Sequence, residues 1–313
     1  MRVVVALGGN ALYTGMTPSE ERSVRLRATA VQLADLIGAG HELVITHGNG
    51  PQVGERLLDR EARMAAGDAG PENPLDVLVA MTQAEIGYRI QRALGRELAN
   101  RGLPREVVAI ISQVVVNPTD PAFAVPTKPV GPVLTSASSD GVPVVEVPGG
   151  WRRVVASPAP LALVEVASVK SMLEAGAVPI CAGGGGIPVV SDGDQLLGVE
   201  AVVDKDASSA LLACDLDADA LVILTDVDAV QIDFGTDHAR ALSVLTTGDV
   251  EDLFWRHQAP SGSMGPKLLA LVRAANEGRE AVLGPLGSAL DTLEGRIGTR
   301  VLVGPSTGVV SAS

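Results

Sequence analysis

The chain has 313 residues, of which 46% are hydrophobic and only 2% aromatic, and its formal net charge at pH 7 is −13. This charge argues against binding to nucleic acid, which depends on basic residues that neutralise phosphates, and against binding to anionic membrane surfaces. Because aromatic residues are so scarce, the core must consist mainly of Val, Leu, Ile and Ala, as is typical of buried parallel strands.

The first hundred or so residues alternate short aliphatic runs with longer helical patterns. We expect strands at 3–7, 43–46 and 107–112, and helices at 19–37, 51–66 and 75–101. Such alternation predicts an α/β fold in which helices cover both faces of a mainly parallel sheet.

Residues 117–157 interrupt this alternation. They are rich in proline, and strand-like pieces at 142–147 and 152–155 alternate with turns. A disordered linker is the alternative, but Trp151 and the strand-like pieces favour an inserted flap on the main domain.

Alternation resumes in the second half. We expect helices at 161–175, 249–257 and 264–277, a further helix from about 205 to 213, and strands at 178–182, 221–224, 281–283 and 301–303.

The five apolar residues at 3–7 are too few for a signal-peptide core. Since no apolar run reaches the ~20 residues of a spanning helix, we expect a cytoplasmic protein. Cys181 and Cys214 lack metal-ligand spacing and are interpreted as small buried hydrophobic residues.

Lysine is rare and unusually placed. The sequence contains four lysines, Lys128, Lys170, Lys205 and Lys267, and its other basic residues are arginines. Three of the four lie among Gly, Pro, Asp or Ser instead of on a plain helix face, and Lys170 is interpreted as a surface residue. Because an ammonium group is a compact and mobile point charge, lysines near helix starts are suited to meeting an anion.

Three aliphatic strands end in glycine-rich loops, at 8–9, 48–50 and 183–186. Ligands of an open parallel sheet bind at the carboxyl ends of its strands, and glycine lets backbone N–H groups converge on an anion there. Any one loop could simply be a turn, but three on one edge predict a phosphate site. Neither the Walker A pattern nor the dinucleotide fingerprint is present, so the site must have another design.

This design suits phosphoryl transfer, in which catalysis consists mostly of positioning and charge stabilisation. Lys205 and Lys267 could reach one phosphoryl group from different segments. Asp206 could orient both ammonium groups, or cap the following helix, or do both. Asp204 is interpreted as structural. Residues 225–228 could contact a nucleotide or form a turn with an Asx cap.

These residues resemble the carbamate kinases of the amino acid kinase superfamily over the whole chain length. The shared segments are 6–11 (ALGGNA), 47–54 (HGNGPQVG), 81–83 (MTQ) with 87–88 (GY), 120–123 (DPAF), 126–132 (PTKPVGP), 150–155 (GWRRVV), 183–188 (GGGGIP), 198–206 (GVEAVVDKD) and 262–267 (GSMGPK). The segments around Lys128 and Lys267 separate the carbamate kinases from their relatives.

The resemblance implies a three-layer αβα sandwich that forms a homodimer and catalyses ATP + carbamate ⇌ ADP + carbamoyl phosphate with Mg²⁺. It implies one domain, 1–313, with a carbamate-side half to about 160, a nucleotide-side half from about 161, and a protruding lid subdomain at 117–157. In many organisms the reverse direction yields ATP from arginine breakdown. A kinase for glutamate, aspartate or acetylglutamate is one alternative, and a non-catalytic nucleotide-binding protein is another.

The resemblance also implies roles for individual residues. The candidate catalytic residues are Lys205, Lys267, Asp206 and the lid lysine Lys128, and no side chain is assigned as a metal ligand. The candidate substrate and phosphate loops contain Gly8, Gly9, Asn10, Gly48, Asn49, Gly50, Gly184 and Gly185. The candidate nucleotide-binding residues are Thr225, Asp226, Val227 and Met264.

Two features of the sequence bear on this resemblance. The lysine that many superfamily members have before the first glycine pair is absent here, as in carbamate kinases, and Lys205 is expected to replace it. The flap segment 133–148 is shorter and richer in Pro and Ser than the resemblance implies, which bears on the shape of the lid.

Overall fold

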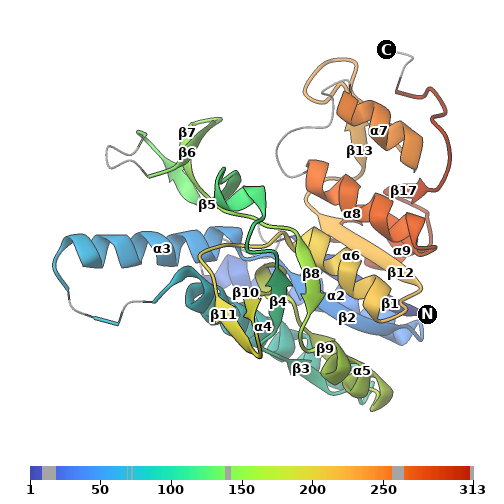
Figure 1. Ribbon diagram of the computed structural model, residues 1–313. Helices are drawn as coiled ribbons and strands as arrows, with labels where there is room; N and C mark the ends of the chain where they lie inside the picture. Colours follow the sequence, from blue (N-terminus) through green and yellow to red (C-terminus); the bar gives the residue numbers. More distant parts are fainter. Residues whose placement is uncertain (9–18, 69, 72, 138–141, 256–263, 311–313) are drawn as a thin grey trace.

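A computed structural model describes residues 1–8, 19–68, 70–71, 73–137, 142–255 and 264–310 (Figure 1). Its centre is an eight-stranded sheet with the order β15-β17-β16-β12-β1-β2-β9-β3. Its strands are β1 (Arg2–Leu7), β2 (Glu42–His47), β3 (Val107–Ala109), β9 (Val178–Ile180), β12 (Ala220–Thr225), β15 (Val244–Thr246), β16 (Glu280–Pro285) and β17 (Thr299–Leu302). Neighbouring strands are parallel except β16 and β17, which confirms the expected mainly parallel sheet.

Helices cover both faces of this sheet. One face packs on α2 (Ser19–Gly38), α4 (Leu75–Asn100) and α9 (Ala289–Leu293), and the other on α5 (Val166–Glu174), α6 (Lys205–Asp215), α7 (Thr247–Trp255) and α8 (Met264–Asn276). Along β1, Val3, Val5 and Leu7 belong to the first core and Val4 and Ala6 to the second. Since successive side chains of a strand point to opposite faces, this aliphatic strand supplies both cores of a three-layer αβα sandwich.

Three smaller sheets accompany the central one. β4 (Gln113–Val116), β8 (Pro160–Leu163), β10 (Ile187–Asp192) and β11 (Gln195–Gly198) form a four-stranded sheet, and β13 (Val230–Ile232) pairs with β14 (Arg240–Leu242). The third contains β5 (Lys128–Leu134), β6 (Val144–Val147) and β7 (Gly150–Val155). The remaining elements are α3 (Gly50–Ala65) and the short 3₁₀ turns Pro121–Phe123 and Gly183–Gly185. None of the helices among these residues is both long and apolar enough to cross a membrane.

The helix expected at 161–175 is wrong in its first part. Residues 160–163 form β8, which pairs with β4 through Leu163 and Val114, and the helix begins only at Val166. Residues 164–165 join the two elements, and the Glu165 carboxylate accepts hydrogen bonds from the backbone N and the side-chain Nε2 of Gln113 at 2.8 and 3.0 Å. A strand partner remote in sequence therefore overrides the local helical pattern.

Other differences are smaller. The strand expected at 107–112 ends at Ala109, and the strands β4, β5, β10, β11, β13, β14 and β15 and the helix α9 were not expected. Both cysteines are free thiols, but only Cys181 is buried as expected, and Cys214 is half-buried.

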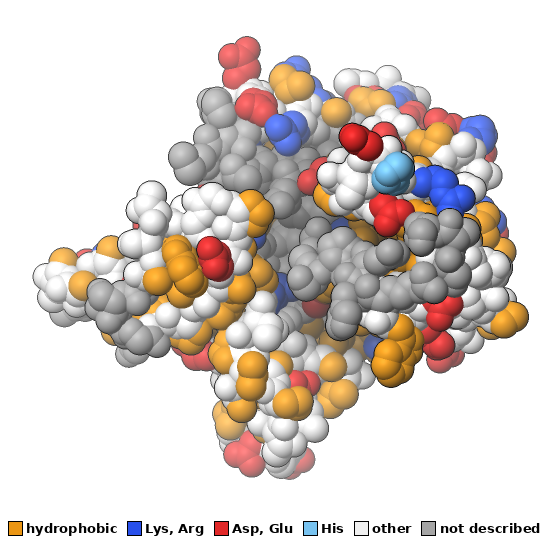
Figure 2. All heavy atoms as spheres, turned by 90° about the horizontal axis from the view of Figure 1, so that it is seen from above, with side chains coloured by type: hydrophobic (Ala, Val, Ile, Leu, Met, Phe, Trp, Pro, Cys, Tyr) orange, Lys and Arg blue, Asp and Glu red, His pale blue; other side chains and the backbone are white. Residues whose placement is uncertain are grey.

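The sheet β5-β7-β6 projects beside α3, away from the central sheet (Figure 1). Hydrophobic side chains gather on this projecting sheet in Figure 2, and Val133 and Val145 are among its exposed residues. At its base, a Cβ on Gly54 of α3 would lie only 1.9 Å from the backbone N of Gly131, where the φ angle is +71°. The projecting sheet thus lies directly on α3. That residues 117–157 move as a lid, and that the chain divides near residue 160, remain predictions.

We predict that Gly54→Ala destabilises the protein by about 1–3 kcal/mol or more, because the added methyl forces α3 and β5 apart. Gly95 is a matched control, since it lies in α4 with no atom within 4 Å of an added Cβ. Gly95→Ala should stabilise the protein by roughly 0.5–1 kcal/mol. Urea unfolding of both variants measures the two effects, and an unchanged stability of Gly54→Ala would contradict the close packing.

Candidate functional site

Three of the expected segments meet at the carboxyl edge of the central sheet. In the register of β1, Leu7 lies beside His47 of β2 and Leu224 of β12. The backbone N of Gly8 donates to Leu224 O, and the backbone N of Gly48 donates to Leu7 O, both at 3.0 Å. Gly8, Gly48 and the end of β12 therefore share one edge. Gly9 and Asn10 lie outside the described residues.

The start of α6 is organised by Asp204. Its Oδ1 accepts hydrogen bonds from the backbone N of Asp206 at 2.9 Å and of Ala207 at 3.2 Å, so it is the N-cap. The sequence left open whether Asp206 caps this helix, but the N-cap is Asp204. Because these two amides are already bonded, an anion at this helix start must be met mainly by side chains.

Asp206 lies between the two lysines. Lys205 Nζ bonds to Asp206 Oδ1, and Lys267 Nζ lies 3.4 Å from Asp206 Oδ2. All three residues are buried, with exposed fractions of 8% for Lys205, 2% for Asp206 and 7% for Lys267. Lys267 lies in the first turn of α8, which packs against α6. The expected proximity of the two lysines is thus present in the fold.

The charges at this centre are not balanced. Burial lowers the pKa of Lys205, and the neighbouring Lys267 lowers it further, while the carboxylate of Asp206 opposes both effects. A second ammonium beside the first raises the free energy of the charged form in a buried site. An arriving anion would relieve this repulsion, so the geometry suits a negatively charged ligand.

Lys128 reaches the same place from the projecting sheet. Its Nζ lies 3.0 Å from Asp204 Oδ2, and both side chains are partly buried. Burial alone would raise the pKa of Asp204, but the charge of Lys128 and its hydrogen bond hold that pKa well below its usual range. Asp204, interpreted from sequence as structural, is therefore also an ionic partner of a candidate site residue.

The glycine run has a packing role that the sequence did not reveal. A Cβ on Gly183 would lie 2.4 Å from His47 Nε2, and one on Gly184 would lie 2.3 Å from Asn49 Nδ2. A Cβ on Gly185 would lie 2.4 Å from the backbone O of Val203. Gly184 and Gly185 are buried with φ angles of +65° and +90°, which side chains rarely adopt. The turn can thus pack directly on the loop after β2, and whether it also binds phosphate remains a prediction.

Two polar residues of α4 hold this turn and loop, and sequence reasoning assigned neither a role. Gln83 Nε2 donates to Ser112 O at 3.0 Å and to Gly183 O at 2.9 Å, and its Oε1 accepts from Ser112 N at 3.0 Å. Thr82 Oγ1 accepts from Asn49 Nδ2 at 2.9 Å. The available signal was a pair of polar residues on the otherwise apolar buried face of this helix.

The candidate nucleotide residues come from the end of β12, with the two residues after it, and from the first residue of α8. Thr225 ends β12 and its Oγ1 donates to Asp226 Oδ1 at 3.0 Å. Val227 and Met264 are partly buried against the hydrophobic core between the central sheet and the helices α5, α6, α7 and α8. Gly50 is the first residue of α3. No contact in the structure assigns these residues to a nucleotide, so their role remains a prediction.

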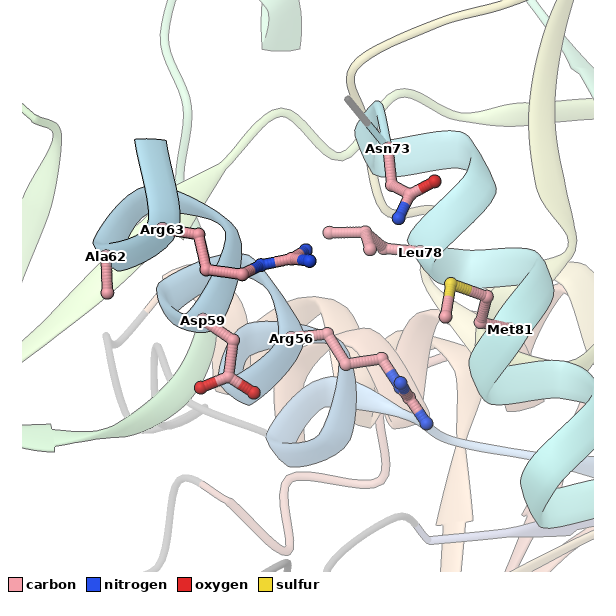
Figure 3. Close-up of a pocket in the computed structure, with 7 residues that line it drawn as sticks. All are labelled: Arg56, Asp59, Ala62, Arg63, Asn73, Leu78 and Met81. Carbon is pink, nitrogen blue, oxygen red and sulfur yellow. The ribbon is translucent and has the colours of Figure 1, made fainter. Parts of the chain in front are cut away.

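A cleft of about 480 Å³ lies elsewhere, between α3 and α4 (Figure 3). Arg56 and Arg63 extend into it from α3, opposite Leu78 and Met81. Arg56 is paired at 2.6 Å with Glu85 of α4. This cleft contains none of the candidate residues. In the described part of the chain, no group of three or more His, Cys, Asp or Glu side chains is arranged to hold a metal ion.

Comparisons with known proteins agree with this architecture. A family model described as "Amino acid kinase family" matches residues 1–284. The carbamate kinase of Pyrococcus furiosus is 45% identical over 311 residues, which cover 96% of this chain and 99% of that protein. The structure of carbamate kinase from Giardia lamblia bound to citric acid has a TM-score of 0.88 and 35% identity, and the match covers 97% of this chain and 98% of that one. The same Giardia enzyme bound to AMP-PNP has a TM-score of 0.85, also at 35% identity and with the same coverage.

We predict that His47 stays neutral down to about pH 5. Burial lowers its pKa to about 4; the nearby charge of Lys205 acts in the same direction, and the hydrogen bond to Gly48 O opposes both. As pH falls below about 6.5, the unfolded chain takes up a proton on this histidine and the folded chain does not. The free energy of unfolding therefore decreases as pH falls from about 6.5 toward 4. An NMR titration, with the imidazole signal assigned by its loss in His47→Gln, measures the pKa directly. A midpoint near 6.5 would contradict this environment.

Proposed function

We propose that this chain, which belongs to the amino acid kinase family and within it to the carbamate kinases, transfers a phosphoryl group reversibly between ATP and carbamate. The observation that supports this most is the pair of buried ammonium groups, Lys205 and Lys267, on the two oxygens of Asp206. The loose transition state of phosphoryl transfer needs its charge stabilised more than it needs covalent help, and two fixed cations supply this.

In this proposal a carbamate oxygen attacks the γ-phosphorus in line with the bond to ADP. Lys205 and Lys267 stabilise the negative charge as it shifts from the attacking oxygen toward the leaving oxygen. Carbamate is already an anion, so the reaction needs no strong general base. His47, which is buried and neutral near pH 7, agrees with a loop-anchoring role better than with a base.

Mg²⁺ is expected to arrive as part of the nucleotide substrate. Magnesium prefers phosphate oxygens and water to an all-protein cage. The carboxylates nearest the two lysines, Asp204 and Asp206, already face ammonium groups. The donor set therefore fits a metal ion that is held chiefly by the phosphates of ATP or ADP.

The glycine loops are proposed to receive the phosphates and the carbamate. Support comes from the position of Gly8 and Gly48 on the same sheet edge, next to the start of α3. The same proposal includes Gly9 and Asn10, which lie outside the described residues, and Asn49, Gly50, Gly184 and Gly185. The residues proposed for the nucleotide are Thr225, Asp226, Val227 and Met264.

The biological setting follows from the family alone. We infer a cytoplasmic homodimer that works toward ATP synthesis from carbamoyl phosphate in arginine catabolism.

The two site lysines should be essential for turnover. We predict that Lys205→Met and Lys267→Met each lower kcat by ~10²–10³, because each removes one preorganised charge from the transferring phosphoryl group. Asp206 keeps one ammonium partner in either variant, so the fold should persist, which circular dichroism checks. Lys170→Met is the matched control, since Lys170 lies on α5 and should not affect kcat. Near-normal turnover in either site variant would end this assignment.

The substrate is tested by direct assay. We expect ATP to form from ADP and carbamoyl phosphate, and this activity to disappear when EDTA removes Mg²⁺. ATP should not be consumed with glutamate, aspartate or acetylglutamate as the acceptor. Consumption with one of these would point to a kinase for a different carboxylate, and nucleotide binding without any transfer would point to a non-catalytic protein.

A further inference from the structure

The two carboxylate oxygens of Asp204 have different partners. Oδ1 accepts from the backbone N of Asp206 and of Ala207, and thereby caps α6. Oδ2 accepts from Lys128 Nζ at 3.0 Å. One side chain therefore joins the first turn of α6, which holds Lys205 and Asp206, to the first residue of the projecting sheet.

We propose that Asp204 is a positioning residue that holds the Lys128 ammonium beside the Lys205–Asp206–Lys267 centre, where it meets the carbamoyl end of the substrate. This inference rests on the proposed function. It concerns the binding of carbamoyl phosphate rather than the transfer step itself.

The surroundings of Lys128 explain why an anchor is needed. Its backbone is fixed, because Lys128 pairs with Val155 in β7 and β5 lies on α3 at the contact between Gly131 and Gly54. Its side chain has four rotatable carbon bonds, and a free lysine loses much conformational entropy when a ligand immobilises it. A carboxylate that already holds the ammonium reduces this entropy cost before the substrate arrives.

The carboxylate of Asp204 is suited to this task at neutral pH. Although burial by itself would raise its pKa, the charge and hydrogen bond of Lys128, the charge of Lys205 and the amide of Ala207 together lower it. Asp204 therefore remains ionised at neutral pH, where the lysine is charged as well. The bond to Lys128 is then charge-assisted at both ends.

Electrostatics alone predict the opposite effect of Asp204 on substrate affinity. The cluster contains three ammonium groups, Lys128, Lys205 and Lys267, and two carboxylates, Asp204 and Asp206. Removing one negative charge raises the net positive charge, which should bind an anionic substrate more tightly. If Asp204 acts by positioning Lys128, its neutralisation should instead weaken binding. The sign of the change in KM separates these two roles.

The central test is Asp204→Asn, which keeps a good N-cap oxygen and removes the charge that holds Lys128. With ADP in excess, we expect the KM for carbamoyl phosphate to rise roughly tenfold while kcat changes less, the size expected for one charged hydrogen bond. The effect should vanish in a Lys128→Met background, because the anchored group is then absent. A KM that falls or stays the same, or effects that simply multiply in the double variant, would overturn the inference.

Two further variants separate the positioning role of Asp204 from an effect on protein stability. Asp35→Asn removes the carboxylate of a surface ion pair with Arg101 and should leave both constants unchanged. Asp204→Ser offers a second variant with a good cap and no charge, and it should show the same rise in KM. A wild-type enzyme that makes no ATP from ADP and carbamoyl phosphate would overturn the proposed function and this inference with it. An active wild type with an unaffected Asp204→Asn would overturn this inference alone.

Discussion

The candidate site depends on one interaction, the sharing of the buried Asp206 carboxylate by Lys205 and Lys267. Two ammonium groups brought together away from water repel each other strongly, and each loses hydration. The carboxylate offsets enough of this cost to keep both in place, but it leaves an excess of positive charge. The fold therefore maintains a local excess of positive charge in a chain whose formal net charge is −13.

Two helices that cover the same face of the sheet make this sharing possible. α6 supplies Lys205 and Asp206 in its first turn, and α8 supplies Lys267 in its own first turn. Their mutual packing brings residues about sixty positions apart in sequence to the same carboxylate. Asp204 caps α6 and so fixes the backbone from which the two α6 side chains project.

Close backbone packing determines the rest of the site. The glycines of the turn at 183–186 have no side chains, so this turn lies directly against His47, Asn49 and Val203. Because Gly54 and Gly131 also lack side chains, α3 lies directly against β5. The projecting sheet is then near enough for Lys128 to reach Asp204. Glycine at these places serves contact between elements as well as turn formation.

The sequence by itself determined the α/β class, the glycine loops at strand ends and the unusual placement of three of its four lysines. These features are written in local patterns, namely aliphatic runs, helix starts and short motifs whose family resemblance the comparisons confirm. Only the tertiary structure decided that 160–163 is a strand, that Asp204 pairs with Lys128, and that Gln83 holds the glycine turn. Each of these depends on a partner supplied by the folded chain, such as β4, Lys128 or the backbone of Ser112, and no local pattern encodes such a partner.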